Sequence, residues 1–291
     1  MKCDMHVHTV HSGMCTIPVM RLVCRESYNQ PEALYDSLKA QGMDLVTITD
    51  HDSIDAVEVL RSRPDFFLSE EVTCHLPGGT EIHVGVYDLN DRQHIEIQRR
   101  ADDFLALHAY LNEQDLLYSA NHIFSGLTGR RTAEDFQWFE NAFPAVEARN
   151  GCMLERSNQA AAAFAKSLGK APIGGSDAHA MMSVGSCWTE VEHARNKQEF
   201  LAGVRLGLAK VCGESGSFWK LTRDVFWIGG QMMRECPATL PLAVLSPAAA
   251  AITLVNYLME VHFVKKWTPR VLPALSHGQL IAETVVEEVA A

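Results

Sequence analysis

The chain has 291 residues, of which 47% are hydrophobic and 21% are charged, and its formal net charge is −11. This length can bury a sizeable core, either in one large domain or in a domain with an appendage. The negative charge argues against a nonspecific nucleic-acid binder, whose affinity depends on neutralising phosphates. A nucleotide substrate stays open, because bound divalent metals can reverse the local field.

The eight cysteines are scattered and include no Cys-x-x-Cys pair. This usage is typical of reduced thiols in a cytosolic protein, not of a disulfide framework or a structural zinc site. The first residues do not resemble a signal peptide, because His6 and His8 stand where an apolar segment would be. We therefore expect a cytoplasmic protein.

His6 and His8 are also the first candidate metal ligands. Residues two apart on a β-strand project from the same face, so the two imidazoles would point side by side and could hold one ion. Alone this is weak evidence, since His-x-His also occurs by chance in ordinary strands. Residues 11–18 follow as a loop.

Helix-like and strand-like segments then alternate along the chain. Helices are expected over residues 30–42, 94–114, 136–143, 158–168 and 196–208. Strands are expected over residues 45–49, 82–86, 116–122, 145–147, 172–174 and 189–191. This alternation predicts parallel strands in an α/β barrel, in which catalytic groups lie at the C-terminal ends of the strands.

Residues that can bind metal recur at the ends of these strands. The candidate ligands are His6, His8, His51, Glu71, His83, His122, Asp177 and His179. Imidazole nitrogens and carboxylates suit zinc, manganese or iron. Each residue alone has an ordinary explanation, as a hydrogen-bonded core histidine, a helix cap or a surface carboxylate. Their joint recurrence at strand ends predicts a site for several ions.

With these motifs the chain resembles the PHP (polymerase and histidinol phosphatase) superfamily of metal-dependent phosphoesterases. The resemblance covers about residues 1–217 and rests on residues 6–9, 49–52, 71–73, 122 and 175–179. It implies a distorted (β/α)7 TIM-like barrel that holds two or three divalent ions.

The resemblance also implies which residues share an ion. One ion would be held by His6, His8, Glu71 and Asp177. A second would be held by Glu71, His83 and His122, so that Glu71 bridges the two. Where a third ion exists, His51 and His179 would hold it.

Two positions depart from the family pattern. An aspartate that binds the third ion usually follows the serine of the first motif, whereas Gly13 follows Ser12 here. We therefore expect two tightly bound ions, and His11 is the alternative ligand that could complete a third site. The usual Ala-His-Pro is replaced by Asn-His-Ile around His122, which keeps the ligand and changes the loop.

The ligands and the resemblance predict a hydrolase that cleaves a phosphate ester of a small metabolite or nucleotide. In this hypothesis a metal-activated hydroxide attacks phosphorus in line, and the ions with an arginine neutralise the developing charge. His179 or His51 would protonate the leaving oxygen if no third ion occupies it.

A phosphate substrate also needs a cationic clamp, which guanidinium groups provide well. Arg130 and Arg131, on the loop after His122, are the first candidates, followed by Arg149 and Arg156. The alternative explanation for these residues is that they are solvated surface arginines.

Two other functions stay open. A metal-dependent nuclease for short oligonucleotides would need a longer basic groove than this acidic chain suggests. A non-catalytic metal-binding module, acting through its C-terminal extension, would have no need of so complete a ligand set. We expect a small phosphorylated substrate and no stable nucleic-acid complex.

The last quarter of the sequence differs in composition. We assign residues 1–216 to the barrel and residues 217–291 to a helical extension, with the Gly- and Ser-rich residues 211–217 as the boundary. The first segment of the extension, residues 218–235, has helical spacing. Residues 237–259 carry no charge and are long enough to span a bilayer. Because two prolines and an asparagine interrupt them, we expect packing on the barrel or in a homo-oligomer, with membrane association as the alternative.

Overall fold

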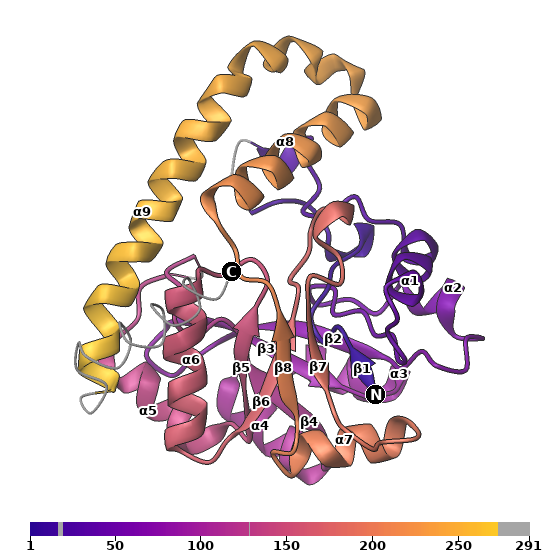
Figure 1. The fold of residues 1–291 in the computed structure, drawn as a ribbon, viewed down its shortest axis with the longest axis vertical. Coiled ribbons are helices and arrows are strands. Elements are labelled where there is room, and N and C mark those ends of the chain that lie inside the picture. The colour runs from indigo at the N-terminus through magenta and orange to yellow at the C-terminus, as the bar shows by residue number, and fades with distance from the viewer. Residues whose placement is uncertain (17–19, 128, 273–291) are drawn as a thin grey trace, which may run out of the picture.

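The strands form two sheets in the computed structural model, which describes residues 1–16, 20–127 and 129–272. The larger sheet consists, in spatial order, of β2 (Ser69–His75), β3 (Glu81–Tyr87), β4 (Leu117–Ala120), β5 (Ala145–Asn150) and β6 (Ala171–Gly175). The smaller consists of β1 (Lys2–Cys3), β7 (Cys187–Glu190) and β8 (Lys210–Gly213). The result is a mixed α/β fold (Figure 1).

Strand direction agrees with the sequence in only half of the larger sheet. The strands β4, β5 and β6 are parallel to one another, as helix-and-strand alternation predicts. By contrast, β3 is antiparallel to both β2 and β4. Residues 76–80 alone connect β2 to β3, and so short a connection can join only antiparallel strands. The expectation of parallel strands throughout is therefore wrong.

Two segments outside the regular strands connect the edges of the larger sheet. Residues 5–8 lie beside the end of β6, where the His8 N–H donates to the carbonyl of Ala178 over 3.3 Å. Residues 46–52 lie between this segment and β2, because the Thr49 N–H donates to Val7 and the Glu71 N–H donates to Asp50. The expected strand over 45–49 contributes only isolated bridges, and the described strands do not form a closed barrel.

Helices flank the sheets. They are α1 (Pro31–Ala40), α2 (Val57–Leu60), α3 (Asp91–Gln98), α4 (Phe104–Glu113), α5 (Ala133–Ala142), α6 (Glu155–Ser167), α7 (Lys197–Arg205), α8 (Phe218–Glu235) and α9 (Ser246–Val271). The single helix expected over 94–114 is two helices, because the Asp103 side chain caps α4 by accepting from the N–H groups of Leu105 and Ala106. The expected boundary over 211–217 is partly strand β8.

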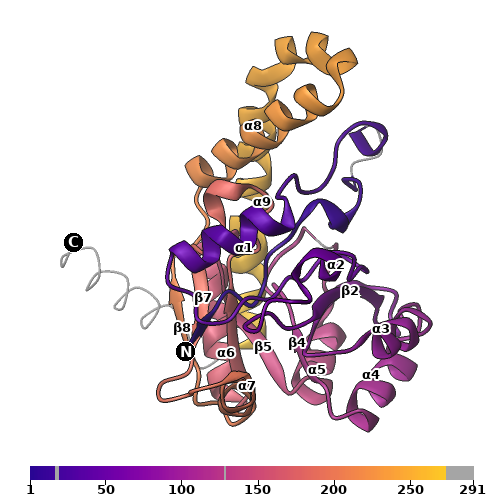
Figure 2. The ribbon, with the colours of Figure 1, turned by 90° about the vertical axis from the view of Figure 1, so that its right-hand side faces the viewer.

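The helices α8 and α9 form a hairpin that stands away from the sheets (Figures 1 and 2). The second half of α9 returns to the core, where Trp267 is buried with its ring centroid 5.3 Å from that of Phe136. Glu260, also on α9, accepts a 2.9 Å hydrogen bond from the Gly126 N–H. This half of the extension is therefore anchored.

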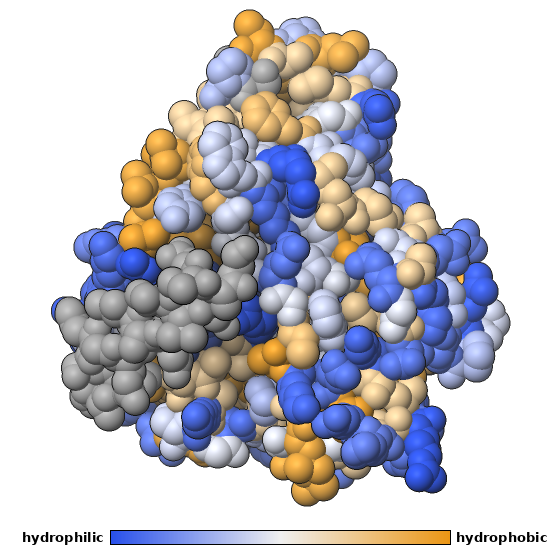
Figure 3. Space-filling view, in the orientation of Figure 1, coloured by the Kyte–Doolittle hydropathy of each residue, from blue (hydrophilic) through white to orange (hydrophobic). Residues whose placement is uncertain are grey.

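The first half of α9 and the 3-10 segment Pro237–Leu245 before it are not packed on the barrel, so of the two arrangements expected for them the homo-oligomer interface stays a prediction. Their exposed apolar residues are Leu240, Leu242, Val244, Ile252, Leu254, Val255, Leu258 and Met259. Figure 3 shows apolar atoms gathered at the tip of the hairpin. In the described part of the chain, Pro247–Val271 is the one stretch long and apolar enough to cross a membrane, and 17% of its most apolar window is buried.

Candidate metal centre

The eight predicted metal ligands converge from six segments that are distant in the sequence. Their donor atoms form four triplets in which all atoms lie within 4.8 Å of one another. The triplets are His6, His8 and Asp177; His6, Glu71 and His122; His51, Glu71 and His83; and His8, His51 and His179. The structure thus brings together all of the residues proposed from the sequence as ligands. Among the described residues, no such triplet includes His11.

Glu71, which is fully buried on β2, lies at the centre of the cluster. Its Oε1 lies 3.3 Å from His122 Nε2 and 3.5 Å from His83 Nδ1. Its Oε2 lies 3.1 Å from His6 Nε2. The two oxygens thus face different groups of histidines, which is the arrangement that a bridging carboxylate needs.

Several buried polar atoms of the cluster have no hydrogen-bond partner. They are His6 Nε2, His8 Nε2, Glu71 Oε2, His83 Nδ1 and His179 Nε2. Leaving such atoms unsatisfied is costly, so a protein seldom retains several of them in one place without a ligand. Imidazole nitrogens together with carboxylate oxygens match the preference of divalent transition metals. The residues present therefore fit a group of metal ions.

A second layer of polar residues orients these ligands. Glu147 on β5 lies 2.7 Å from His6 Nδ1 and accepts from the His122 N–H over 2.9 Å. Asn150 donates both to Glu147 and to Asp177 Oδ2. Because His6 Nδ1 is engaged, its Nε2 is left to face the cluster. Sequence analysis missed Glu147 and Asn150, although Glu147 ends one of the predicted strands.

Similar bonds orient Glu71 and His8. The Asn121 amide donates to Glu71 Oε1 over 2.8 Å. His8 Nδ1 lies 3.0 Å from Ser12 Oγ, which in turn donates to Asp50 Oδ1 over 2.6 Å. Asp50 is buried and accepts from both the N–H and the hydroxyl of Thr9. Thr9, Ser12 and Asp50, which stand next to the ligands in the sequence motifs, thus help to hold His8 in place.

The carboxylates of the cluster are ionised. Burial alone would raise the pKa of Glu71, but attraction to His6 and His83 outweighs it and holds this pKa well below its usual range. The pKa of Asp177 is lowered in the same way, because attraction to His6 outweighs burial. Two carboxylates therefore stay negatively charged in a buried site, which favours cation binding.

The histidines divide into two kinds. Burial lowers the pKa of His8 to about 4 and lowers that of His51 well below its usual value. By contrast, although burial opposes it, attraction to Glu71 raises the pKa of His83 to about 10 and raises that of His6. At neutral pH the first pair is neutral and can coordinate a metal directly, whereas the second pair must lose protons to do so.

The arginines proposed as a phosphate clamp lie in different surroundings. Arg131 is buried, donates to the carbonyl of Glu81 over 2.7 Å and lies over the ring of Phe139. Arg130 and Arg156 are exposed. The assignment of Arg130 and Arg131 to phosphate binding stays a prediction.

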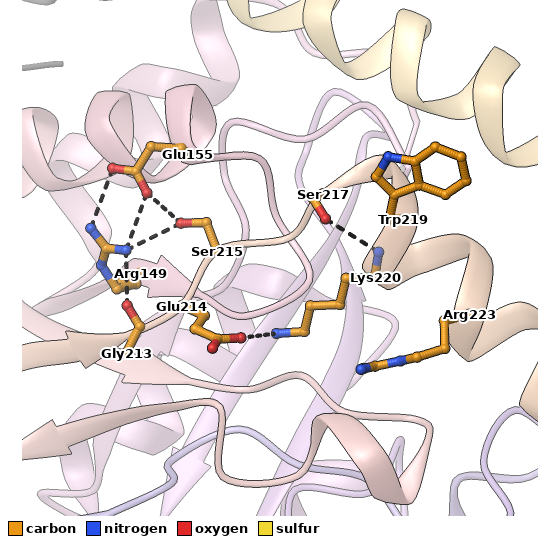
Figure 4. A pocket seen from close by; sticks show the side chains of 9 residues that line it. All are labelled: Arg149, Glu155, Gly213, Glu214, Ser215, Ser217, Trp219, Lys220 and Arg223. Atoms are coloured by element: carbon orange, nitrogen blue, oxygen red, sulfur yellow. Dashed lines mark hydrogen bonds and ion pairs between the residues drawn. The ribbon is translucent and has the colours of Figure 1, made fainter. Parts of the chain in front are cut away.

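Arg149 lies in a pocket of about 540 Å³ at the base of α8 (Figure 4). Its guanidinium donates to Glu155, Ser215 and the carbonyl of Gly213. Lys220 lines the same pocket, which contains none of the eight ligands. The hydrogen bonds of Arg149 therefore connect β5 to α6, to the end of β8 and to the segment after it.

Comparisons with known proteins give one family match and several similar folds. Residues 155–208 match the family model described as PHP-associated. A two-domain protein containing a predicted PHP-like metal-dependent phosphoesterase, from Bacteroides vulgatus, has a similar fold at 16% identity, with a TM-score of 0.57 over 78% of this chain and 69% of that one. PsfC from Pseudomonas syringae is similar at 17% identity, with a TM-score of 0.55 over 80% of this chain and 98% of that one. No curated protein sequence matches the chain.

Proposed function

The PHP-associated match and the shared fold support membership of this chain in the PHP superfamily, and on that premise we propose that the protein is a metal-dependent phosphoesterase. The observation that carries the proposal is the position of Glu71, whose two oxygens face separate histidines in a buried cluster. We assign His6, His8, Glu71 and Asp177 to one ion. The second ion is assigned to Glu71, His83 and His122.

Bound divalent ions supply Lewis acidity, which activates water and neutralises charge that develops on a transferred phosphoryl group. The residues of the chain prepare this chemistry. Glu147 holds the His6 ring with Nε2 toward the cluster, and Asn121 holds the Glu71 carboxylate in its central position. If no third ion occupies it, His179 is a candidate to protonate the leaving oxygen, because its Nδ1 lies 3.0 Å from the carbonyl of Asp177 and its Nε2 has no hydrogen-bond partner.

The fold is proposed to be a distorted (β/α)7 barrel over residues 1–216. Backbone bonds connect β6 to residues 5–8, then to residues 46–52, and then to β2, so these two segments stand in for two barrel strands. Such a barrel would gather its ligands at one end, as the cluster does. Residues 217–272 are proposed to be a helical extension, and residues 273–291 of the expected extension lie outside the described residues.

The proposed substrate is a phosphate ester of a small metabolite or nucleotide, with Arg130 as the candidate clamp because it is exposed on the loop after His122. A cytoplasmic location is proposed because all eight cysteines are free.

The test is a hydrolysis screen over sugar phosphates, nucleotides and short RNA, with metal content measured on the same sample. We expect turnover of a small phosphate ester, and His6→Ala or Asp177→Ala should lose metal and activity together. Turnover of short RNA alone would favour the nuclease function. Less than one equivalent of transition metal, with no activity after manganese or zinc is added, would rule out the proposal.

A further inference from the structure

The cluster contains a donor set that the two assigned ions do not use. His51 lies in the segment 46–52 and His179 follows β6. Each ring lies against that of His8, with centroids 4.6 Å and 4.2 Å away. The Nε2 of His179 has no hydrogen-bond partner. On the sequence alone this set lacks a carboxylate, because Gly13 stands where the family pattern has an aspartate.

Glu26 supplies a carboxylate at this place. Its Oε1 lies 3.9 Å from His51 Nε2 and 3.9 Å from His179 Nε2, and its side chain is 23% exposed. A separation of 3.9 Å is too long for a hydrogen bond. Two ligands that each lie about 2.0–2.2 Å from a shared ion are about 3–4 Å apart, so the carboxylate stands at the distance expected of a co-ligand of each histidine. The three donor atoms together are not among the triplets that lie within 4.8 Å of one another.

The loop that carries Glu26 places it beside the missing side chain. Met14 forms an antiparallel bridge with Arg25, and the Cys15 N–H donates to the carbonyl of Cys24 over 3.0 Å. The next bond of this ladder runs from the Glu26 N–H to the carbonyl of Gly13 over 3.1 Å. Residues 13 and 26 are therefore backbone neighbours across this ladder.

We propose that Glu26 is the carboxylate ligand of a third divalent cation, which it holds together with His51 and His179. Two imidazoles and one carboxylate form a three-ligand set of the kind that leaves a coordination position open for water or substrate. This inference rests on the proposed function for its first two ions. It replaces His11 as the residue that compensates for Gly13.

The test counts ions and does not depend on turnover. Protein stripped with a chelator is dialysed to equilibrium against Mn²⁺, and the bound equivalents are measured by elemental analysis. We expect three equivalents in the native chain and in Glu32→Ala, whose carboxylate is exposed on α1. Glu26→Ala should keep two ions. Its affinity for the third ion should fall by more than the factor of about 10–100 that is typical of losing an outer-shell partner.

Further variants make the result decisive. Glu26→Gln keeps the side-chain length and should also lose the third ion, so a folding defect in Glu26→Ala would not obscure the outcome. His11→Ala should retain all three. The inference is overturned if the native chain binds only two ions, if Glu26→Ala binds as many as the native chain, or if His11→Ala alone loses one. If no phosphate ester is hydrolysed but Glu26→Ala still loses one ion, the ligand assignment holds and only the proposed function fails.

Discussion

His6 Nδ1 and Glu147 Oε1 lie 2.7 Å apart, and both side chains are almost completely buried. The carboxylate accepts a hydrogen bond from the Nδ1–H group, which favours the tautomer that leaves Nε2 free to coordinate. The other oxygen of Glu147 accepts from the His122 N–H and from Asn150, so one carboxylate sets the position of two ligand-bearing segments.

We therefore expect Glu147→Gln to lower metal affinity by about 10–100-fold, because an amide cannot hold the protonated Nδ1 as a carboxylate does. Affinity is measured by competition with a chelator of known strength. Glu113→Gln, a change of an exposed carboxylate on α4, serves as the control and should leave affinity unchanged. Equal affinities for Glu147→Gln and the control would contradict the orienting role.

Adjacent carboxylates on β2 give a matched pair for testing the bridge. Glu71 faces the histidine cluster, whereas Glu70 lies on the other side of the strand and accepts from His94 and Gln98. Glu71→Gln should weaken both assigned ions by at least about tenfold, because both lose a charged ligand. Glu70→Gln should keep both ions. Near-normal turnover and metal content in Glu71→Gln would show that another carboxylate makes the bridge.

The pKa of His94 is expected to lie above 6.5. Its Nδ1 is 2.7 Å from Glu70 Oε2, and this hydrogen bond is the largest cause of the increase. Burial in turn raises the pKa of Glu70, despite its attraction to His94. Because the folded-state pKa of His94 exceeds the unfolded one, the stabilisation from its proton is fully present below about pH 6.5 and is lost as pH rises through the folded value.

Two-dimensional NMR of the imidazole resonances measures this pKa directly. Glu70→Gln removes the carboxylate and should lower the pKa of His94. The native chain should have a larger free energy of unfolding than His94→Gln at low pH. This difference should shrink as the pH rises above about 6.5. A His94 pKa that is the same with and without the Glu70 carboxylate would contradict the assigned cause.

The ligand set could be predicted from the sequence because each member ends a strand-like run or lies in a compact motif. Glu26 could not, because its position depends on a backbone ladder between residues 13–15 and 24–26 that no local pattern reveals. Glu147 ends a predicted strand, but nothing in the sequence says which face of the strand it occupies.

The antiparallel pairing, by contrast, does have a signal in the sequence. The antiparallel pairing of β2 and β3 is announced by Pro77, Gly78 and Gly79, a turn-forming group between two strand-like runs. The exposure of residues 237–259 had no such signal, because an uncharged apolar stretch has the same composition whether it is buried in a core or exposed on a hairpin. What decides the matter is the packing of α9, which anchors only its second half.

The two halves of α9 should therefore respond differently to substitution. Trp267 is 5% exposed and packs against Phe136 and Phe263, so Trp267→Ala should lower the free energy of unfolding by about 3–5 kcal/mol. Leu258 is 56% exposed, and Leu258→Ser should change the free energy of unfolding by no more than about 0.5 kcal/mol. Chemical denaturation of both variants measures the difference.

The exposed half can then be examined separately for what it binds. A contiguous apolar surface of this kind is typical of an interface, and we propose a second copy of the chain as its partner. Sedimentation equilibrium should show self-association of the native chain that Leu254→Ser with Leu258→Ser reduces, while Trp267 keeps the hairpin anchored. A chain ending at Ser217 should be destabilised or aggregate, because it lacks Trp267. If that shortened chain instead stays soluble, monomeric and equally heat-stable, and the native chain binds lipid vesicles without self-associating, the apolar half is a membrane contact and not an interface between copies.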